Sequence, residues 1–398
     1  MNKQCHLTPK TSLSDSIEQQ LNGFARQISG YKNRSIGYPI NQELGLTEFY
    51  SWYNQSGLSE IALNNAGAPR QTSIAPLNTH SFENEVIDFL APLYQFKPDN
   101  TWGLITSSGT QGNNLGIYFG ARLLSKQTGL TPILYVSAEA HYSIKQLAEL
   151  QQLETRVIQT LVDGRIDVED LERQLEPDRP ALIVVAIGTT FKGAIDDQQA
   201  IQQVLADKKP IAVYRHLDAA LFGGILPFSA HAEILNQQQN VYDSIAVSGH
   251  KFFGIDEPAG IFITTRNTLS MQNPVQVAYL NQEISTLACS RSALAPLKLW
   301  WKIKTTGIQS YQQQSQQLLT NARYLKQCLD AIAYPAWLGP CSNIVYFQRP
   351  SQAIMEKWLL APDADPRLGG ALAHVVVMQH VNTNILDAFV KDLRLEHI

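Results

Sequence analysis

Cysteine is scarce in this sequence, and strong charge of either sign is absent. The cysteines Cys5, Cys289, Cys328 and Cys341 form no CxxC pair, so we expect reduced thiols and no metal site. The net charge of -4 is not gathered into long runs, which argues against a nucleic-acid partner. A signal peptide and bilayer-spanning apolar runs are also lacking, so we expect a cytoplasmic protein without a membrane partner.

What is present is a regular alternation of apolar runs and helical patterns. The apolar runs are continuous, which is typical of strands buried on both faces of a parallel sheet. Helical patterns between them indicate a three-layer α/β domain. Strands are predicted at residues 102–106, 133–136, 182–187, 211–216, 244–247 and 260–264.

The same patterns divide the chain into three parts. Residues 1–80 resemble a covering arm, with one helix followed by irregular chain rich in Gly and Pro. Residues 81–335 form the large α/β domain, and residues 336–398, with two strands and a final helix, form a small α+β domain. We expect 398 residues to suffice for one large domain and one smaller one.

Four motifs that follow predicted strands carry the chemistry, and the first is Thr-Ser-Ser-Gly-Thr-Gln-Gly-Asn at 106–113. Small residues such as Gly109 let the backbone approach an anion closely, and the next helix offers free N–H groups and its positive end. A phosphate group fits such a loop. The pattern also describes an ordinary capped turn.

The second and third motifs provide a carboxylate and a lysine. Asp218 ends an apolar strand, where it can keep a pyridine nitrogen protonated, and Ala220 can lie beneath the ring. In Ser-Gly-His-Lys at 248–251, Lys251 can form and exchange an imine while Ser248 and His250 donate to a phosphate. Each residue taken alone also has an ordinary explanation: an aspartate such as Asp218 is common in turns, and a lysine such as Lys251 is usually a solvated surface residue.

The fourth motif is His141, which follows the predicted strand 133–136. Its flat imidazole can stack on an aromatic cofactor and leave its nitrogens for acid-base work, although such a histidine is often only structural. An anion loop, a stacking histidine, an aspartate and Ser-x-His-Lys, in this order, are the pattern of a fold-type I enzyme of pyridoxal 5′-phosphate (PLP).

These residues also bring the sequence close to a known family. It resembles the group II PLP-dependent amino-acid decarboxylases, and among them the shorter bacterial histidine decarboxylases. The resemblance implies a fold-type I three-layer domain with a mainly parallel sheet, a small C-terminal α+β domain, and a homodimer with active sites at the subunit interface. The matching stretches lie at 36–39, 77–78, 108–110, 112–113, 141–143, 187–190, 193–194, 196–197, 216, 218–221, 225–228, 243–244, 247–251 and 290–291.

The resemblance also implies roles for single residues. Lys251 holds PLP through an imine, Asp218 pairs with the pyridine nitrogen, and His141 stacks on the ring. The phosphate contacts are Gly109, Thr110, Ser248 and His250, Thr190 faces the cofactor, and Tyr38, Asn78 and Arg291 line or support the substrate pocket. The proton that returns to Cα comes from His141 or from a tyrosine of the partner subunit.

Departures from the family pattern concern the substrate more than the cofactor. Changed positions include Ser107, Ser108, Gln111, Leu217, Phe222 and Cys289, and two acids, Asp256 and Glu257, follow Lys251. These acids either border the pocket and favour a cationic substrate or are solvated loop residues. L-Histidine leads as the substrate, and the alternatives are another amino acid, such as 2,4-diaminobutyrate or another cationic or small one, and another fold-type I lyase reaction. A PLP-binding regulator is disfavoured because residues 1–80 contain no basic recognition helix.

Overall fold

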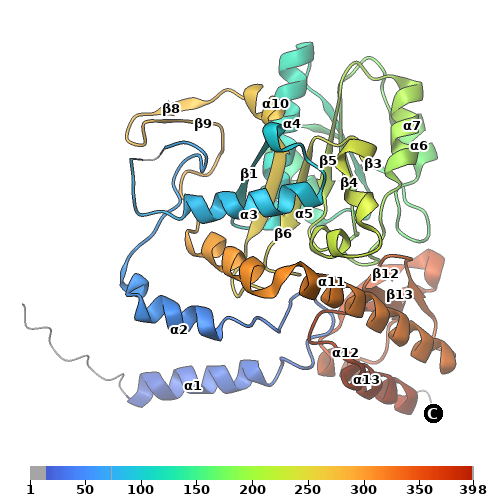
Figure 1. Cartoon of the computed structure of the whole chain (residues 1–398). Helices are drawn as coiled ribbons and strands as arrows, with labels where there is room; N and C mark the ends of the chain where they lie inside the picture. Colours follow the sequence, from blue (N-terminus) through green and yellow to red (C-terminus); the bar gives the residue numbers. More distant parts are fainter. Residues whose placement is uncertain (1–14, 73, 397–398) are drawn as a thin grey trace, which may run out of the picture.

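A seven-stranded sheet forms the centre of the larger part of the protein (Figure 1). The computed structural model describes residues 15–72 and 74–396, so Cys5 lies outside the described residues. The strand order is β1-β7-β6-β5-β4-β2-β3, and β7 is the strand that runs antiparallel to its neighbours. The strands are β1 (Thr101–Thr106), β2 (Ile133–Ser137), β3 (Glu154–Ile158), β4 (Ala181–Ala186), β5 (Val213–Asp218), β6 (Ser244–Ser248) and β7 (Gly260–Thr265).

Six of these strands are the predicted ones, and the largest differences concern β5 and β3. The strand predicted at 211–216 is β5, which starts and ends two residues later, so that Asp218 itself ends it. β3 was not predicted, because it lies at the edge of the sheet and its side chains, apart from Ile158, are exposed or half-buried. Its sequence, Glu-Thr-Arg-Val-Ile, therefore lacks the continuous apolar run on which the other predictions depended.

Helices cover both faces of this sheet and make it the middle of three layers. Along β2, Leu134 and Val136 pack with α4 and α5, whereas Ile133 and Tyr135 belong to the core on the opposite face, beside α6 and α7. This alternation follows from the two-residue period of a strand. The helices are α3 (His80–Leu93), α4 (Gly109–Thr128), α5 (Tyr142–Leu150), α6 (Val168–Gln174), α7 (Gln198–Lys208), α8 (Phe222–Ile225), α9 (Gln237–Asn240) and α10 (Arg266–Ser270).

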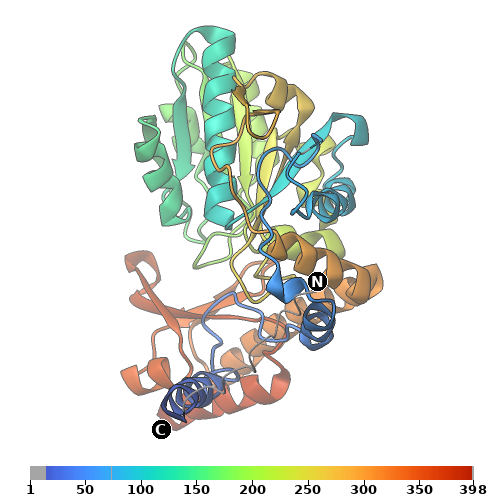
Figure 2. The ribbon, with the colours of Figure 1, turned by 90° about the vertical axis from the view of Figure 1, so that its left-hand side faces the viewer.

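A second, antiparallel sheet lies below the first in Figure 2. Its strand order is β10-β11-β13-β12, and it begins at Ala336. Together with its helices it is a small α+β part, as the sequence predicts, but with four strands where two were predicted. Its elements are β10 (Ala336–Leu338), β11 (Ile344–Gln348), α12 (Gln352–Lys357), β12 (Ala361–Asp365), β13 (Gly370–Val376) and α13 (Thr383–Glu396).

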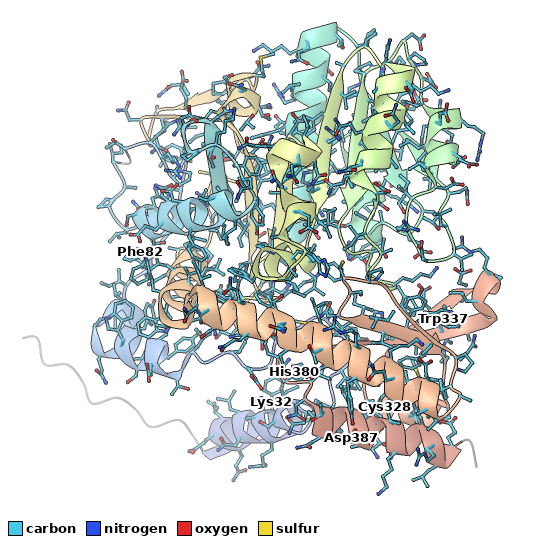
Figure 3. All side chains as sticks on the ribbon, turned by 45° about the vertical axis from the view of Figure 1, so that its right-hand side comes forward. Lys32, Phe82, Cys328, Trp337, His380 and Asp387 are labelled. Atoms are coloured by element: carbon cyan, nitrogen blue, oxygen red, sulfur yellow. The ribbon has the colours of Figure 1, made fainter. Side chains whose placement is uncertain are left out.

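The long helix α11 (Leu294–Ala331) runs past both sheets, as Figure 3 shows. It packs on α3 and farther along on β10 and α13. Its helical backbone is interrupted at Gly307, which has φ 75° and ψ 161°. Glycine tolerates this conformation because it has no Cβ.

The N-terminal part contains more helix than predicted. Besides α1 (Asp15–Ser29), the segment predicted to be irregular contains α2 (Thr47–Gln55), whose Phe49 packs with Leu297 of α11. After α1 the chain passes the C-terminal part, where His380 lies near Lys32 (Figure 3) and His380 Nε2 donates to Ser35 O at 3.0 Å. The remaining elements are the hairpin β8 (Val275–Val277) and β9 (Gln282–Ile284) and short 3₁₀ turns at Leu58–Glu60, Pro98–Asn100, Leu226–Phe228, Ala232–Leu235 and Pro366–Leu368. Among the helices of residues 15–72 and 74–396, none is long and apolar enough to cross a membrane.

Candidate active site

A cavity of about 270 Å³ lies where the parallel strands end, and the second sheet contributes to its wall. Carboxyl ends of parallel strands meet at one edge of a sheet, so residues far apart in the sequence converge there. Every residue predicted to touch the cofactor lines this cavity: Gly109, Thr110, His141, Thr190, Asp218, Ala220, Ser248, His250 and Lys251. Sequence reasoning assigned no role to Pro39, Asn113, Pro258, Ile344 and Val376, which line it too.

The loop between β1 and α4 is built to receive an anion. Ser108 caps α4, since its hydroxyl accepts a hydrogen bond from Gln111 N at 3.2 Å, and Gln111 Oε1 accepts one from Ser107 N at 2.8 Å. The residues that depart from the family pattern here therefore form a capping arrangement of their own. The first N–H groups of α4 have no acceptor within the helix and, with its dipole, favour a negative group.

Gly109, at the start of α4, lies close to the side chain of Ser248 at the end of β6. A Cβ atom at this position would lie 2.4 Å from Ser248 Oγ, which is too close for any non-bonded pair. The missing side chain thus lets the start of α4 and the hydroxyl of Ser248 face the same space. His250 lies two residues after Ser248. Burial lowers the pKa of its imidazole, and the hydrogen bond with the backbone of Ala259 partly raises it again.

Asp218 and His216 lie on the same side of β5, since their positions differ by two. His216 is fully buried; its Nδ1 lies 2.8 Å from Ser244 Oγ and its Nε2 lies 3.0 Å from Asn113 Oδ1. Burial lowers the pKa of His216 to about 3, so the ring is neutral. His216 thereby fixes Asn113, and hence α4, beside Asp218.

Lys251 follows β6 and has the electrostatics of a nucleophilic amine. Burial lowers its pKa, and the nearby charge of Asp218 partly offsets this effect. A lysine that loses its proton more easily than in water can form imines with carbonyl compounds. The lowered pKa favours the neutral amine that the predicted role of Lys251 requires.

His141 is the residue just before α5, and its contacts define where its proton lies. Its Nδ1 accepts a hydrogen bond from the backbone N–H of Ser143 at 3.3 Å and lies 2.7 Å from Ser143 Oγ. Burial lowers the pKa of His141; the charge of Asp218 raises it and that of Lys251 lowers it further. In the neutral ring Nε2 therefore carries the hydrogen, which is available for donation.

The structure places the predicted substrate residues outside this cavity. Tyr38 is exposed, although its neighbour Pro39 lines the cavity. Asn78 Nδ2 donates to Ala75 O at 2.7 Å, and Asn78 Oδ1 accepts from His80 N at 3.0 Å, just before α3. Both side chains are therefore outside the site that this single chain forms.

Arg291 is also outside the cavity, and its contacts hold parts of the fold together. It forms a buried ion pair with Glu83, whose other oxygen accepts from Asn65 Nδ2 at 2.9 Å. Arg291 Nη1 donates to Ile105 O at 3.0 Å and Nη2 to Gly67 O at 3.0 Å. The guanidinium thus joins the N-terminal part, α3 and β1.

The two acids after Lys251 face a lysine and do not line the cavity. Lys298 Nζ lies 2.7 Å from Asp256 Oδ1 and 3.0 Å from Glu257 Oε1, and Tyr50 donates to Asp256 Oδ2 at 2.5 Å. These partners raise the pKa of Lys298, against the lowering effect of its burial. Both acids are loop residues that remain partly exposed, with 31% of each side chain accessible, so they fit the view of loop acids better than that of acids bordering the pocket.

The donor set of the cavity fits PLP. An anion site at the start of α4, a carboxylate at the end of β5, a half-buried amine after β6 and a flat imidazole are the groups that this cofactor requires. Fold and site together define a fold-type I PLP enzyme.

Comparison with known proteins identifies the family. Residues 120–333 match the pyridoxal-dependent decarboxylase conserved domain. The chain is 36% identical to histidine decarboxylase of Solanum lycopersicum over 96% of this chain and 89% of that protein. It is 34% identical to serine decarboxylase 1 of Oryza sativa subsp. japonica, over 93% and 74% of the two chains, and 34% identical to histidine decarboxylase of Vibrio campbellii, over 96% and 95%.

The chain therefore belongs to the pyridoxal-dependent decarboxylase family, and it is a PLP-dependent amino-acid decarboxylase. Solved structures show the same fold. L-Methionine decarboxylase from Streptomyces sp.590 superposes with a TM-score of 0.85 at 20% identity, over 98% of this chain and 96% of that one. Glutamate decarboxylase of Lactobacillus brevis superposes with a TM-score of 0.78 at 17% identity, over 100% and 95%.

Proposed function

We propose that the protein converts L-histidine into histamine and carbon dioxide. The observation that carries this proposal is the 36% identity to a histidine decarboxylase along 96% of the chain. A bacterial histidine decarboxylase, of Acinetobacter baumannii, is 31% identical over 96% of both chains, so the similarity is not confined to one group of organisms. The burial of Arg291 and the pairing of Asp256 and Glu257 leave the recognition of the imidazole to other residues.

The chain's own residues divide the work at the site. We assign phosphate binding to Gly109, Thr110, Ser248 and His250, and covalent attachment of the cofactor to Lys251, whose pKa is lowered by burial. Thr190 lines the same cavity and faces the cofactor in this assignment. PLP, when bound, accepts the electron pair that departing carbon dioxide leaves at Cα.

Three residues prepare that step. Asp218, at the end of β5, holds the proton on the pyridine nitrogen, which makes the ring an electron acceptor. His141 and Ala220, which both line the cavity, would lie against the two faces of the ring. His141 Nε2–H is one candidate donor for the proton that replaces the carboxylate at Cα, and a tyrosine of a partner subunit is the other.

Serine is the second candidate substrate. The serine decarboxylase of Oryza sativa subsp. japonica is 34% identical to this chain, close to the value for the histidine decarboxylases. A site that accepts serine needs less space and no partner for an imidazole. The two substrates therefore differ in what the pocket must bind beyond Cβ.

A panel of amino acids tests the substrate. Carbon dioxide release should be measured with L-histidine, serine, 2,4-diaminobutyrate, ornithine, lysine, aspartate and aromatic amino acids, with Lys251→Ala as the inactive control. We expect turnover of L-histidine above all others. Robust turnover of another member with none of histidine would refute the substrate and leave the decarboxylase intact.

We also propose that the protein forms a homodimer with active sites at the subunit interface. The apolar residues Ile17, Leu21, Phe24 and Ile28 of α1 are 47–63% exposed and recur at the spacing of one helix face. Tyr38 and Asn78, which do not line the cavity of their own chain, would then lie near a partner. Light scattering should give about twice the mass of 44.3 kDa, and a purely monomeric protein would contradict the proposal.

A further inference from the structure

A cluster of four charged side chains lies beside the cavity but outside it. Lys192 Nζ lies 2.6 Å from Glu139 Oε1 and 2.6 Å from Asp365 Oδ2, and it donates to Val162 O at 3.2 Å. Only 2% of the Lys192 side chain is exposed. Arg367 Nη2 lies 2.8 Å from Asp365 Oδ2 and 3.3 Å from Glu139 Oε1. Two cations thus balance two carboxylates.

The members of the cluster come from three parts of the chain, two of which carry cavity residues. Glu139 is two residues before His141 in the loop after β2, and Lys192 is two residues after Thr190 in the loop after β4. Asp365 ends β12 of the second sheet. The Lys192 amine therefore connects two loops of the cavity with the sheet on its other side.

The second sheet, to which Lys192 connects the two loops, is itself part of the cavity wall. Ile344 and Val376 line the cavity from β11 and β13. Gly193, next to Lys192, has φ +64° and packs so closely that a Cβ atom would lie 2.4 Å from Ser342 Oγ. The spacing between the loops and the second sheet therefore sets the shape of the site.

We propose that Lys192 is a positioning residue for the cofactor site, because its ammonium fixes the loops of His141 and Thr190 against the second sheet. The inference rests on the proposed roles of His141 and Thr190 toward PLP. Removing a buried cation leaves its carboxylates to repel each other in a medium that screens charge poorly. The two carboxylates then share the single cation of Arg367, and the Glu139 and Asp365 segments are no longer held together by Lys192. We expect them to move apart, and the ring of His141 to move with Glu139.

The test is PLP binding by the apoenzyme of Lys192→Met. We expect a dissociation constant raised about tenfold or more, as when outer partners of bound metals are removed. The visible circular dichroism per bound PLP should also fall, because it reports how the ring is held. Lys192→Met/Glu139→Gln should recover much of the affinity, since it removes one of the two repelling carboxylates and leaves Asp365 paired with Arg367.

A matched control is Arg156→Met, which removes a cation that pairs with Glu154 and Glu176 at 2.7 Å on the sheet edge. Its PLP affinity should stay within about twofold of wild type, because surface pairs contribute little. An equal affinity for Lys192→Met and this control, or no recovery in the double variant, would overturn the proposal.

If Lys192→Met does not fold, Arg367→Ala replaces it, because Arg367 is 40% exposed. The loss of PLP affinity should then be smaller and in the same direction, and an unchanged affinity would overturn the proposal. PLP binding requires no substrate. Failure to decarboxylate histidine would therefore count against the proposed function and leave this test unaffected.

Discussion

Replacement of Gly109 by alanine should weaken PLP binding without unfolding the protein. The added Cβ would lie 2.4 Å from Ser248 Oγ, but 3.7 Å from Ser248 Cβ and 3.8 Å from Ala220 Cβ, which are ordinary contacts. Rotation of the Ser248 side chain relieves the overlap. The hydroxyl then leaves the place at which we propose that it donates to the phosphate.

The magnitude follows from the lost hydrogen bond. A hydrogen bond to a charged acceptor contributes about 1.5–3 kcal/mol, so the dissociation constant of PLP should rise roughly ten- to hundredfold. The stability of the apoenzyme should not fall, because alanine has a higher helix propensity than glycine.

The assay is a titration of apoenzyme with PLP, followed by visible absorbance. Gly109→Ala/Ser248→Ala should bind PLP about as weakly as Ser248→Ala alone, because both changes remove the same hydrogen bond. Gly23→Ala is a matched control, since a Cβ there, on α1, meets nothing within 4 Å. Two results would refute the reasoning. One is that Gly109→Ala binds PLP with wild-type affinity; the other is that the double variant loses affinity by the product of the two single-variant factors.

Three further predictions concern the residues around the cavity. Borohydride reduction of the holoenzyme should place the label on Lys251, as peptide mapping would show, and a label on another lysine contradicts its assignment. Asp218→Asn should still bind PLP but lose about 10²–10³-fold in kcat, the scale for a preorganised group, and near-full activity would remove Asp218 from the mechanism. The pKa of His216 is lowered by burial from 6.5 to about 3. Its contribution to folding is therefore present above about pH 6.5 and is lost at up to about 1.4 kcal/mol per pH unit as the pH falls toward 3. Urea unfolding of His216→Gln should show a shallower decline over this range, and a slope equal to that of wild type would contradict the prediction.

The cavity residues were predictable because each follows a strand that the sequence marks clearly. Ser248 ends a continuous apolar run, Asp218 ends a mostly apolar segment interrupted by Arg215 and His216, and Gly109 stands between an apolar run and a helical pattern. Strands of this kind are parallel and buried, and their carboxyl ends converge. Local sequence was therefore enough to bring these residues into one site.

Buried ion pairs were not predictable in this way. Arg291 and Glu83 are 208 positions apart, and Lys192 and Asp365 are 173 positions apart. Nothing in the local sequence distinguishes such a residue from a surface charge, since its burial depends on segments that pack from elsewhere. This is why the sequence did not single out Lys192, and why the resemblance alone placed Arg291 among the residues that line or support the substrate pocket.

The two sheets share one continuous apolar core, to which Leu217 of β5, Leu325 of α11 and Phe347 of β11 all belong. Heat should consequently melt both sheets of the apoenzyme together, in one transition. A chain that ends near residue 335 would expose part of this core to water and should aggregate. The second sheet thus stabilises the first sheet through this shared core. Removing it should destabilise the first sheet, even though every cavity residue of the first sheet is still present.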